Sequence, residues 1–338
     1  MSDRSLHAVA LGLALCACFT ADRASAYCQM TTQGGAQIGG APCIEDGAPL
    51  VWNNPCLSYA VDSRGSRWFE DTAEATALEQ IEAVVDASFA AWPSVDCGGD
   101  SPNLIFQPLL PSTCKRAEFN TTGNVNTIAF LDPWKDPCAD VDDPGYDPMA
   151  LAVTIVWHNK QTGAILDADM MINDQLATPR NAGGPYANCP DEGCPPGNPG
   201  DPGDTDLASI VTHEAGHFIG IGHSNVEEAT MFAVAMRTSV EKRTLAQDDR
   251  DAVCAIYPPG DLTESCNAVP EGGLQLNCET TDSGNPIACD GPGAPASSGG
   301  CSAGSTAQSP GDTWVTLLLA LVGLTALRRR SGRRDARS

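Results

Sequence analysis

Three histidines and a glutamate stand close together in IVTHEAGHFIGIGHSN, residues 210–225 of a chain that has five histidines in all. Side chains four residues apart share one face of a helix, so His213 and His217 are expected to point the same way. Histidine is a common zinc ligand, and this spacing on a helix indicates a metal site. Glu214 lies one residue round the helix, within reach of a water bound to the same metal.

A glycine after these residues is expected to bring a third histidine to the metal. Gly220 permits the left-handed turn that ends a helix, and the chain then returns to present His223. Three histidines leave one zinc position open, as catalytic sites do, whereas structural sites are closed by four protein ligands. The alternative, histidines that are only hydrogen-bonded in a core helix, does not explain the regular spacing. The pattern favours one catalytic zinc (Zn2+) with Glu214 as general base.

The elements that must position these residues are both helices and strands. The metal-site helix is expected at 206–219, with Asp204 or Thr205 as its N-cap. A second helix is expected within 71–93, with Asp71 and Glu74 as a capping box, and a last one at 245–258. Strands are predicted at 57–62, 103–107 and 126–132, and a hairpin of 151–158 and 164–173 around NKQTG. These elements indicate an α+β fold.

The motif HEAGHFIGIGHS resembles the extended zinc motif of the metzincin peptidases, and its final Ser224 is similar to that of the matrixin (matrix-metalloproteinase-like) branch. The resemblance weakens outward and runs from about Trp52 to Tyr257. It implies a twisted mixed β-sheet with two long helices in the N-terminal subdomain, an active-site helix, a methionine turn beneath the metal and a C-terminal helix. Met231 matches that turn, and Met236 is the less favoured alternative.

The resemblance also implies a reaction and a partner. It implies zinc-assisted hydrolysis of peptide bonds in a protein or peptide substrate, with Glu214 as the base. The substrate is expected to lie extended along an edge strand, for which 151–158 is the best candidate, and residues 232–243 are expected to shape the specificity pocket. The rival hypothesis is a catalytically silent metzincin-fold protein that only binds or adheres at the cell surface. Loss of Glu214 or of a histidine ligand would favour that rival, and neither is lost.

Two departures from animal matrixins concern further metals and activation. Only His158 remains in the mature chain as a spare histidine, so the second, structural zinc of those relatives is expected to be missing. No prodomain cysteine switch of the PRCG kind precedes Trp52. The acidic loops 131–148 and 190–206 offer oxygen ligands for calcium (Ca2+), although a solvated acidic loop explains each aspartate as well.

Both ends of the chain have the pattern of sorting signals. Residues 1–26 are expected to be a signal peptide cleaved before Tyr27, with lipoprotein cleavage before Cys18 or a membrane anchor as alternatives. Residues 301–338, with a short apolar segment at 314–327 followed by arginines, resemble the C-terminal sorting tag of myxobacterial surface proteins (MYXO-CTERM), and a plain membrane anchor is the alternative. Between them, the sequence predicts an extension at 27–50, a catalytic domain at 51–258 and a Cys/Gly/Pro-rich stalk at 259–300.

The number of cysteines and the net negative charge agree with export to the cell surface or the extracellular space. Twelve cysteines lie between Cys28 and Cys289, an even number that is typical of a disulfide-bonded secreted protein. Cys189 and Cys194 are close enough in sequence to close a small loop. Residues 27–327 carry 11 basic and 40 acidic side chains, a net charge of −29, which argues against nucleic acid as a partner. Calcium binding and solubility are the two interpretations of this acidity.

Overall fold

The computed structural model describes residues 27–34, 43–139, 142–178, 180–194, 204–260, 266–278 and 322–323. The expected signal peptide at 1–26 lies outside these residues. So does the expected tag at 301–338, including the apolar segment 314–327, apart from Val322 and Gly323. Within the described part of the chain, no helix has both the length and the apolar character that a membrane crossing needs.

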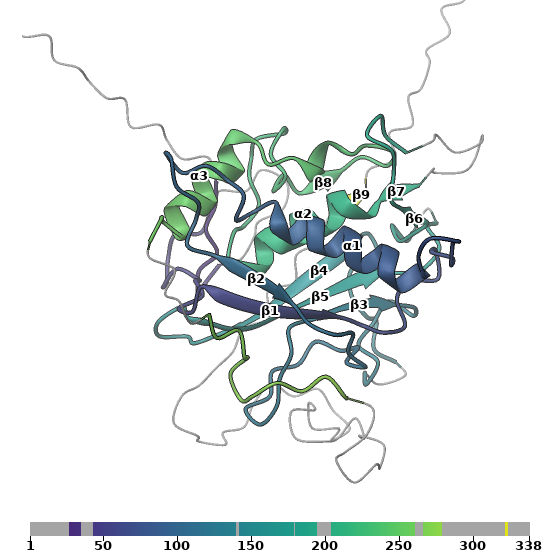
Figure 1. Cartoon of the computed structure of the whole chain (residues 1–338), viewed down its shortest axis with the longest axis horizontal. Coiled ribbons are helices and arrows are strands. Elements are labelled where there is room, and N and C mark those ends of the chain that lie inside the picture. The colour runs from purple at the N-terminus through teal and green to yellow at the C-terminus, as the bar shows by residue number, and fades with distance from the viewer. Residues whose placement is uncertain are drawn as a thin grey trace, which may run out of the picture.

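Five strands form the central sheet, in the order β2-β1-β3-β5-β4 (Figure 1). Parallel pairing joins β1 to β2, β1 to β3 and β3 to β5, whereas β4 and β5 are antiparallel neighbours. The predicted 151–158 and 164–173 hairpin is therefore confirmed, and its first strand, β4, lies at an edge of the sheet. The strands are β1 (Cys56–Val61), β2 (Ile105–Pro108), β3 (Thr127–Leu131), β4 (Ala152–His158) and β5 (Ile165–Asn173).

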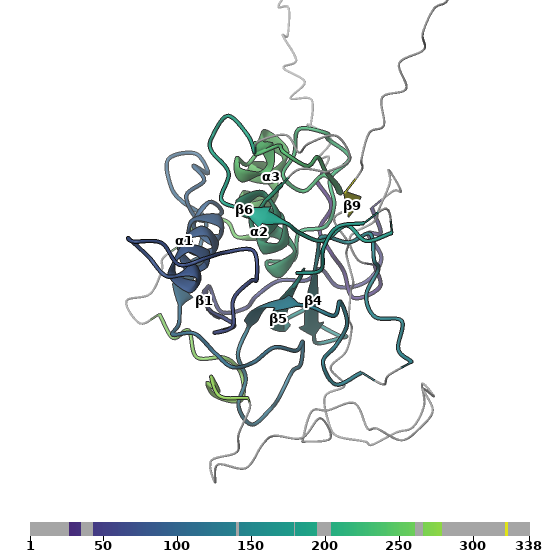
Figure 2. The same ribbon diagram turned by 90° about the vertical axis from the view of Figure 1, so that its right-hand side faces the viewer.

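Helices α1 (Ala77–Ala90) and α2 (Leu207–Phe218) pack together on one face of this sheet (Figures 1 and 2). Helix α3 (Gln247–Ile256) closes the domain near its C-terminal end, after the short 3-10 turn η1 (Glu241–Arg243). Two small parallel ladders pair β6 (Tyr186–Ala187) with β7 (Thr205–Asp206), and β8 (Val234–Ala235) with β9 (Val322–Gly323). The mixed sheet with helices confirms the predicted α+β class.

The capping residues predicted for α1 and α2 were wrong, by five positions for α1 and by one or two positions for α2. The capping box of α1 is formed by Thr76 and Glu79, not by Asp71 and Glu74, because residues 72–75 form a separate turn before the helix begins. Asp71 still contributes, since its carboxylate accepts the N–H of Ala77 at 2.8 Å. The N-cap of α2 is Asp206 rather than Asp204 or Thr205, because Thr205 and Asp206 pair with β6 before the helix starts.

The hydrophobic core is divided by the sheet, because successive side chains of a strand point to opposite faces. The larger core lies between the sheet and the helices, and in it the ring of Phe89 stacks on Tyr59 with 4.3 Å between centroids. A smaller core on the outer face gathers around Trp134. In β4 and β5 the inner side chains include Ala152, Val156, Ala168, Met170 and Ile172, and the outer ones include Val153, Ile155 and Met171.

Two of the disulfides tie the segment after the domain to the region of the sheet. Cys189–Cys194 closes the small loop expected from the sequence. Cys56–Cys266 and Cys114–Cys278 fasten residues 266–278 to β1 and to the loop before β3. Cys28–Cys43 and Cys97–Cys254 are two further disulfides between described residues. The described part of the predicted stalk is thus held against the sheet.

Candidate active site

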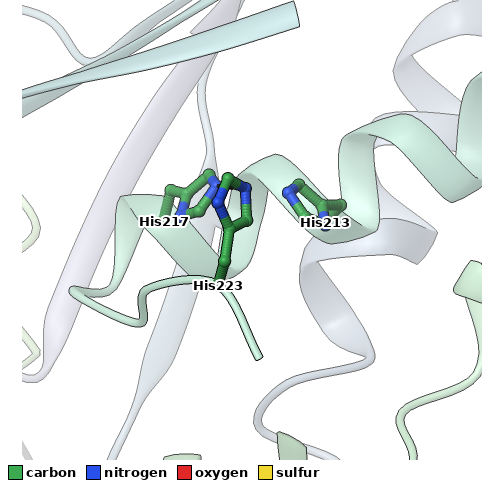
Figure 3. A group of neighbouring side chains, drawn as sticks. All are labelled: His213, His217 and His223. Carbon is green, nitrogen blue, oxygen red and sulfur yellow. Dashed lines mark hydrogen bonds between the residues drawn. The ribbon is translucent and has the colours of Figure 1, made fainter. Parts of the chain in front are cut away.

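The three histidines of the motif converge at the C-terminal end of α2 (Figure 3). His213 and His217 come from the helix, and His223 comes from the loop that follows it. All three are buried, and their ligand nitrogens lie within 4.8 Å of one another. The structure therefore brings together the three residues that the sequence proposed as a metal site.

Backbone carbonyls fix the protonation of two of these rings. The Nδ1 atoms of His213 and His217 lie 2.6 Å and 2.8 Å from the carbonyl oxygens of Thr230 and Ile221. A carbonyl only accepts hydrogen bonds, so each Nδ1 carries the proton and each Nε2 presents a lone pair. The Nε2 of His213 is buried without a hydrogen-bond partner. Burial also lowers the pKa of both rings well below the ordinary 6.5, so they are neutral, as metal ligands must be.

The spacing of the nitrogens fits a zinc ion. The Nε2 atoms of His217 and His223 are 3.2 Å apart. Two nitrogens that bind one zinc at tetrahedral angles stand about 3.3 Å from each other. Three imidazoles with closely spaced nitrogens thus form a donor set suited to zinc, which leaves the fourth position of a tetrahedral ion open.

Glu214 lies beside the histidines and is held by a residue of the sheet. Thr154, on β4, donates its hydroxyl to Glu214 Oε2 at 2.6 Å and is 3.2 Å from the Glu214 carbonyl oxygen. The other carboxylate oxygen, Oε1, is buried without a partner. Burial raises the pKa of Glu214 to about 8, and the Thr154 hydroxyl opposes that rise. One oxygen is therefore fixed and the other is available to a further group.

The loop that carries His223 is shaped by a glycine and by the N-terminal extension. Gly220 has φ +87°, the left-handed conformation expected from the sequence, and a side chain there would meet the Leu50 carbonyl at 2.5 Å. The Met30 N–H donates to the Gly220 carbonyl at 2.9 Å, and the Gly222 N–H donates to the Cys28 carbonyl at 2.6 Å. The disulfide-closed segment before Trp52 thus holds the third histidine in place, a contact that no local pattern in the sequence revealed.

Met231 packs against the helix between its two histidines. It is 1 % exposed, and a Cβ placed on Gly216 of α2 would lie 2.2 Å from its sulfur. Glycine at 216 is therefore what lets the thioether approach the helix so closely. Met236, the alternative, is 53 % exposed and lies away from this contact.

Two charged residues that the sequence did not single out hold the turn around Met231. The carboxylate of Asp249, on α3, accepts the N–H groups of Thr230 at 2.7 Å and Met231 at 3.0 Å. The ammonium of Lys242 donates to the carbonyls of Ala229, Thr230 and Phe232. Burial lowers the pKa of Lys242 to about 8. Because the Thr230 carbonyl also accepts from His213, this network reaches the histidine cluster directly.

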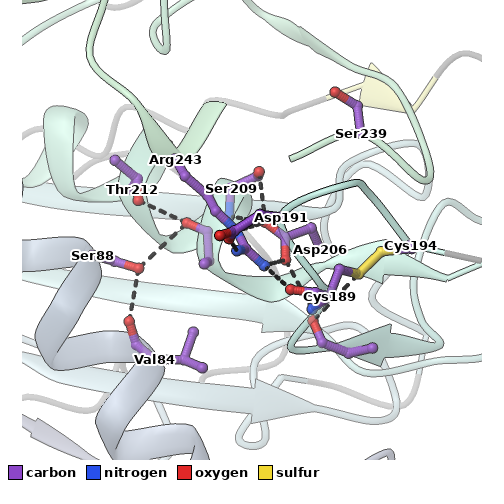
Figure 4. A network of polar contacts seen from close by, with 12 residues as sticks. Val84, Ser88, Cys189, Asp191, Cys194, Asp206, Ser209, Thr212, Ser239 and Arg243 are labelled. Carbon is purple, nitrogen blue, oxygen red and sulfur yellow. Dashed lines mark hydrogen bonds and ion pairs between the residues drawn. A yellow bond between two sulfur atoms is a disulfide. The ribbon is translucent and has the colours of Figure 1, made fainter. Parts of the chain in front are cut away.

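A polar network anchors the other end of α2 (Figure 4). Asp206 accepts the Ser209 N–H at 2.8 Å and pairs through both carboxylate oxygens with Arg243, at 2.8 and 2.5 Å. Arg243 also donates to the Cys189 carbonyl at 2.6 Å. Asp206, Cys189 and Cys194 lie close enough to suggest a second metal site, but the two cysteines form a disulfide and offer no thiolate.

Comparison with known proteins agrees with the motif. The matrixin family model matches residues 52–258, more than half of the chain, and the chain belongs to the matrixin family. Similar proteins include Metalloendoproteinase 1-MMP of Arabidopsis thaliana, 37 % identical over 73 residues that make up 20 % of each chain. Stromelysin-2 of Rattus norvegicus is 33 % identical over 93 residues, which are 26 % of this chain and 18 % of that protein. The chain thus spans about a fifth of the length of the curated relatives it matches.

Proposed function

We propose that this protein is an exported zinc-dependent endopeptidase. The observation that carries the proposal is the convergence of three buried imidazole nitrogens beside a carboxylate with one free oxygen. Membership of the matrixin family supports the same class, and the relatives' names describe metalloendoproteinases. The five disulfides between described residues support folding in an oxidising compartment outside the cytoplasm.

In this proposal His213, His217 and His223 hold the zinc through their Nε2 atoms. When bound, zinc supplies a Lewis acid for the scissile carbonyl and makes a water acidic enough to be the nucleophile at neutral pH. The carbonyls of Thr230 and Ile221 orient two of the rings and make them more basic ligands. A nearby divalent cation also lowers the pKa of Glu214, which favours its ionised form.

Glu214 is the proposed general base. Its Oε1 accepts the proton of the attacking water, and the same oxygen returns that proton to the amine that leaves. The Thr154 hydrogen bond holds Oε2, so the carboxylate rotates little between these two steps. Thr154 acts through Glu214 and is therefore a positioning residue.

The substrate is proposed to be a protein or peptide in an extended conformation. β4 is an edge strand, and Thr154 of that strand contacts Glu214, so a peptide paired with β4 would pass directly over the site. Pairing of backbone groups gives affinity with little dependence on sequence. Preference for particular residues must then come from a pocket beside the zinc.

The test uses the full chain, folded under oxidising conditions. Zinc content and cleavage of an unstructured protein such as reduced casein are measured with and without a chelator, and zinc is then restored. One zinc per chain and chelator-sensitive cleavage that returns with zinc support the proposal. A protein that holds one zinc but cleaves no more than its Glu214→Ala variant would support the silent binding protein instead.

A further inference from the structure

A pocket of about 550 Å³ opens beside the site, between the N-terminal part of α2 and the segment after Met231. Its apolar wall is built from one residue of the helix and several of the following segment: Ile210, Phe232, Val234, Ala235 and Met236. The segment 232–243, expected to shape a specificity pocket, does line this cavity in part. The helix residues and two glutamates from the loop after His223 complete it.

Contacts place this pocket next to the metal ligands. Ile210 lies one helical turn before His213. Lys242 lines the pocket and donates to the Thr230 carbonyl at 3.1 Å, and that same carbonyl accepts from His213. A substrate side chain close to the bond being cut is therefore the group best placed to enter it.

The carboxylates of the pocket outnumber its cations. Glu227, Glu228 and Glu241 are exposed lining residues and form no ion pair with any residue in the described ranges. Asp206 also lines the pocket, but Arg243 neutralises it. The single lining cation, Lys242, directs its ammonium to three carbonyl oxygens of the turn around Met231.

The other nearby cation is also engaged. Arg237 donates to Thr205 Oγ1 at 2.8 Å and to the carbonyls of Ala182 and Gly183. Glu227 and Glu228 thus have no counter-charge among the described residues at the rim of this apolar cavity, whereas Glu241 interacts electrostatically with Lys242 without forming an ion pair. Arginine and lysine side chains match this combination, because their methylene stems pack on apolar walls while their charged ends reach polar rims.

We propose that this pocket selects a long cationic side chain, arginine or lysine, beside the peptide bond that is cleaved. The proposal rests on the proposed peptidase function and adds its substrate class. Glu227, Glu228 and Glu241 provide the selectivity, and Ile210 and Phe232 contact the stem of the side chain.

The experiment compares peptides that differ at one position near the cut, with arginine or its neutral analogue citrulline. We expect arginine to raise kcat/KM about tenfold at low salt, since three exposed charge pairs add modestly, and 0.5 M NaCl to reduce this ratio. The triple variant Glu227→Gln, Glu228→Gln and Glu241→Gln should bring the ratio close to one while cleavage of the citrulline peptide stays unchanged. The matched control Glu70→Gln, Glu74→Gln and Glu271→Gln removes three exposed carboxylates outside the pocket and should keep the wild-type ratio.

Measurement of peptide binding distinguishes failure of the pocket proposal from failure of the proposed peptidase function. The Kd values of the same peptides are measured on zinc-loaded Glu214→Gln protein, where tighter binding of the arginine peptide by about tenfold is expected. Equal binding and equal cleavage of the two peptides would overturn the pocket proposal, as would a triple variant that keeps the preference. If no peptide is cleaved, the peptidase function fails, and the Kd ratio alone decides what the pocket binds.

Discussion

Carboxyl groups are buried on both faces of the β4–β5 hairpin, and their bonding partners differ between the two faces. On the inner face, Glu214 contacts Thr154 of β4 and leaves one oxygen without a partner beside the histidines. On the outer face, Asp167 and Asp169 of β5 are buried side by side, two residues apart on one strand. Neither face has a cation paired with these carboxyl groups among the described residues.

The surroundings of the outer pair favour a protonated carboxyl group. Asp169 accepts the N–H groups of Thr127 at 2.7 Å and Glu118 at 2.9 Å, and Asp167 accepts from Asn124 at 2.6 Å. Burial raises the pKa of both aspartates, and the negative charge of Asp167 raises the pKa of Asp169 further. The inner glutamate instead follows His213 on α2, the helix that carries two histidines of the proposed metal site. We therefore propose that a proton completes the structural carboxyl groups of the outer face, whereas a bound cation completes the site on the inner face.

Replacement of a proposed histidine ligand should show the largest difference in effect between the two faces. His217→Ala should lose bound zinc and at least about a thousandfold in kcat/KM, because the ion then has two protein ligands. His158, the buried histidine at the end of β4, provides the control. His158→Gln should retain one zinc by elemental analysis, and a loss of zinc equal to that of His217→Ala would contradict the assignment of ligands.

The hydroxyl of Thr154 should matter for turnover and little for substrate binding. Thr154→Val keeps the shape of the side chain but removes a hydrogen bond to a carboxylate, worth about 1.5–3 kcal/mol, or roughly 10- to 100-fold in kcat. KM should remain close to the wild-type value, and Thr154→Ser should restore kcat. Steady-state kinetics on all three proteins decide the point, and a valine variant with full kcat would show that the contact is only structural.

The outer pair should affect stability and not turnover. Because its pKa values are raised above the ordinary 3.8, its contribution is fully present below about pH 4 and is lost as the pH rises through the raised folded values. Asp167→Asn mimics the protonated pair and should flatten this dependence by up to about 1.4 kcal/mol per pH unit. Urea unfolding with the disulfides intact, measured from pH 4 to 9, tests this. An unchanged pH slope would show that the pair is ionised.

The sequence predicted the parts of this account that depend on local spacing. The helical periodicity placed His213 and His217 on one face, and the strand alternation located the β4–β5 hairpin. Partners that come from distant segments were missed, because no periodicity links them. Thr154 lies 60 residues from Glu214, and Lys242 reaches the turn at Met231 only through the tertiary fold.

The start of α2 shows the same limit. Asp204, Thr205 and Asp206 are all suitable N-caps by residue type. Asp206 is the N-cap because Thr205 and Asp206 first pair with Tyr186 and Ala187. A long loop separates these two paired segments in the sequence. The buried pair Asp167 and Asp169 was also unexpected, because two aspartates in a strand are read from sequence as polar and exposed.

The most direct test of the catalytic assignment is Glu214→Gln, with zinc content and kcat measured on the same preparation. Glutamine keeps the size of the side chain but cannot accept a proton from the attacking water. We expect one zinc per chain and a fall in kcat of about 100- to 10,000-fold. A variant that retains zinc and cleaves at the wild-type rate would contradict this assignment.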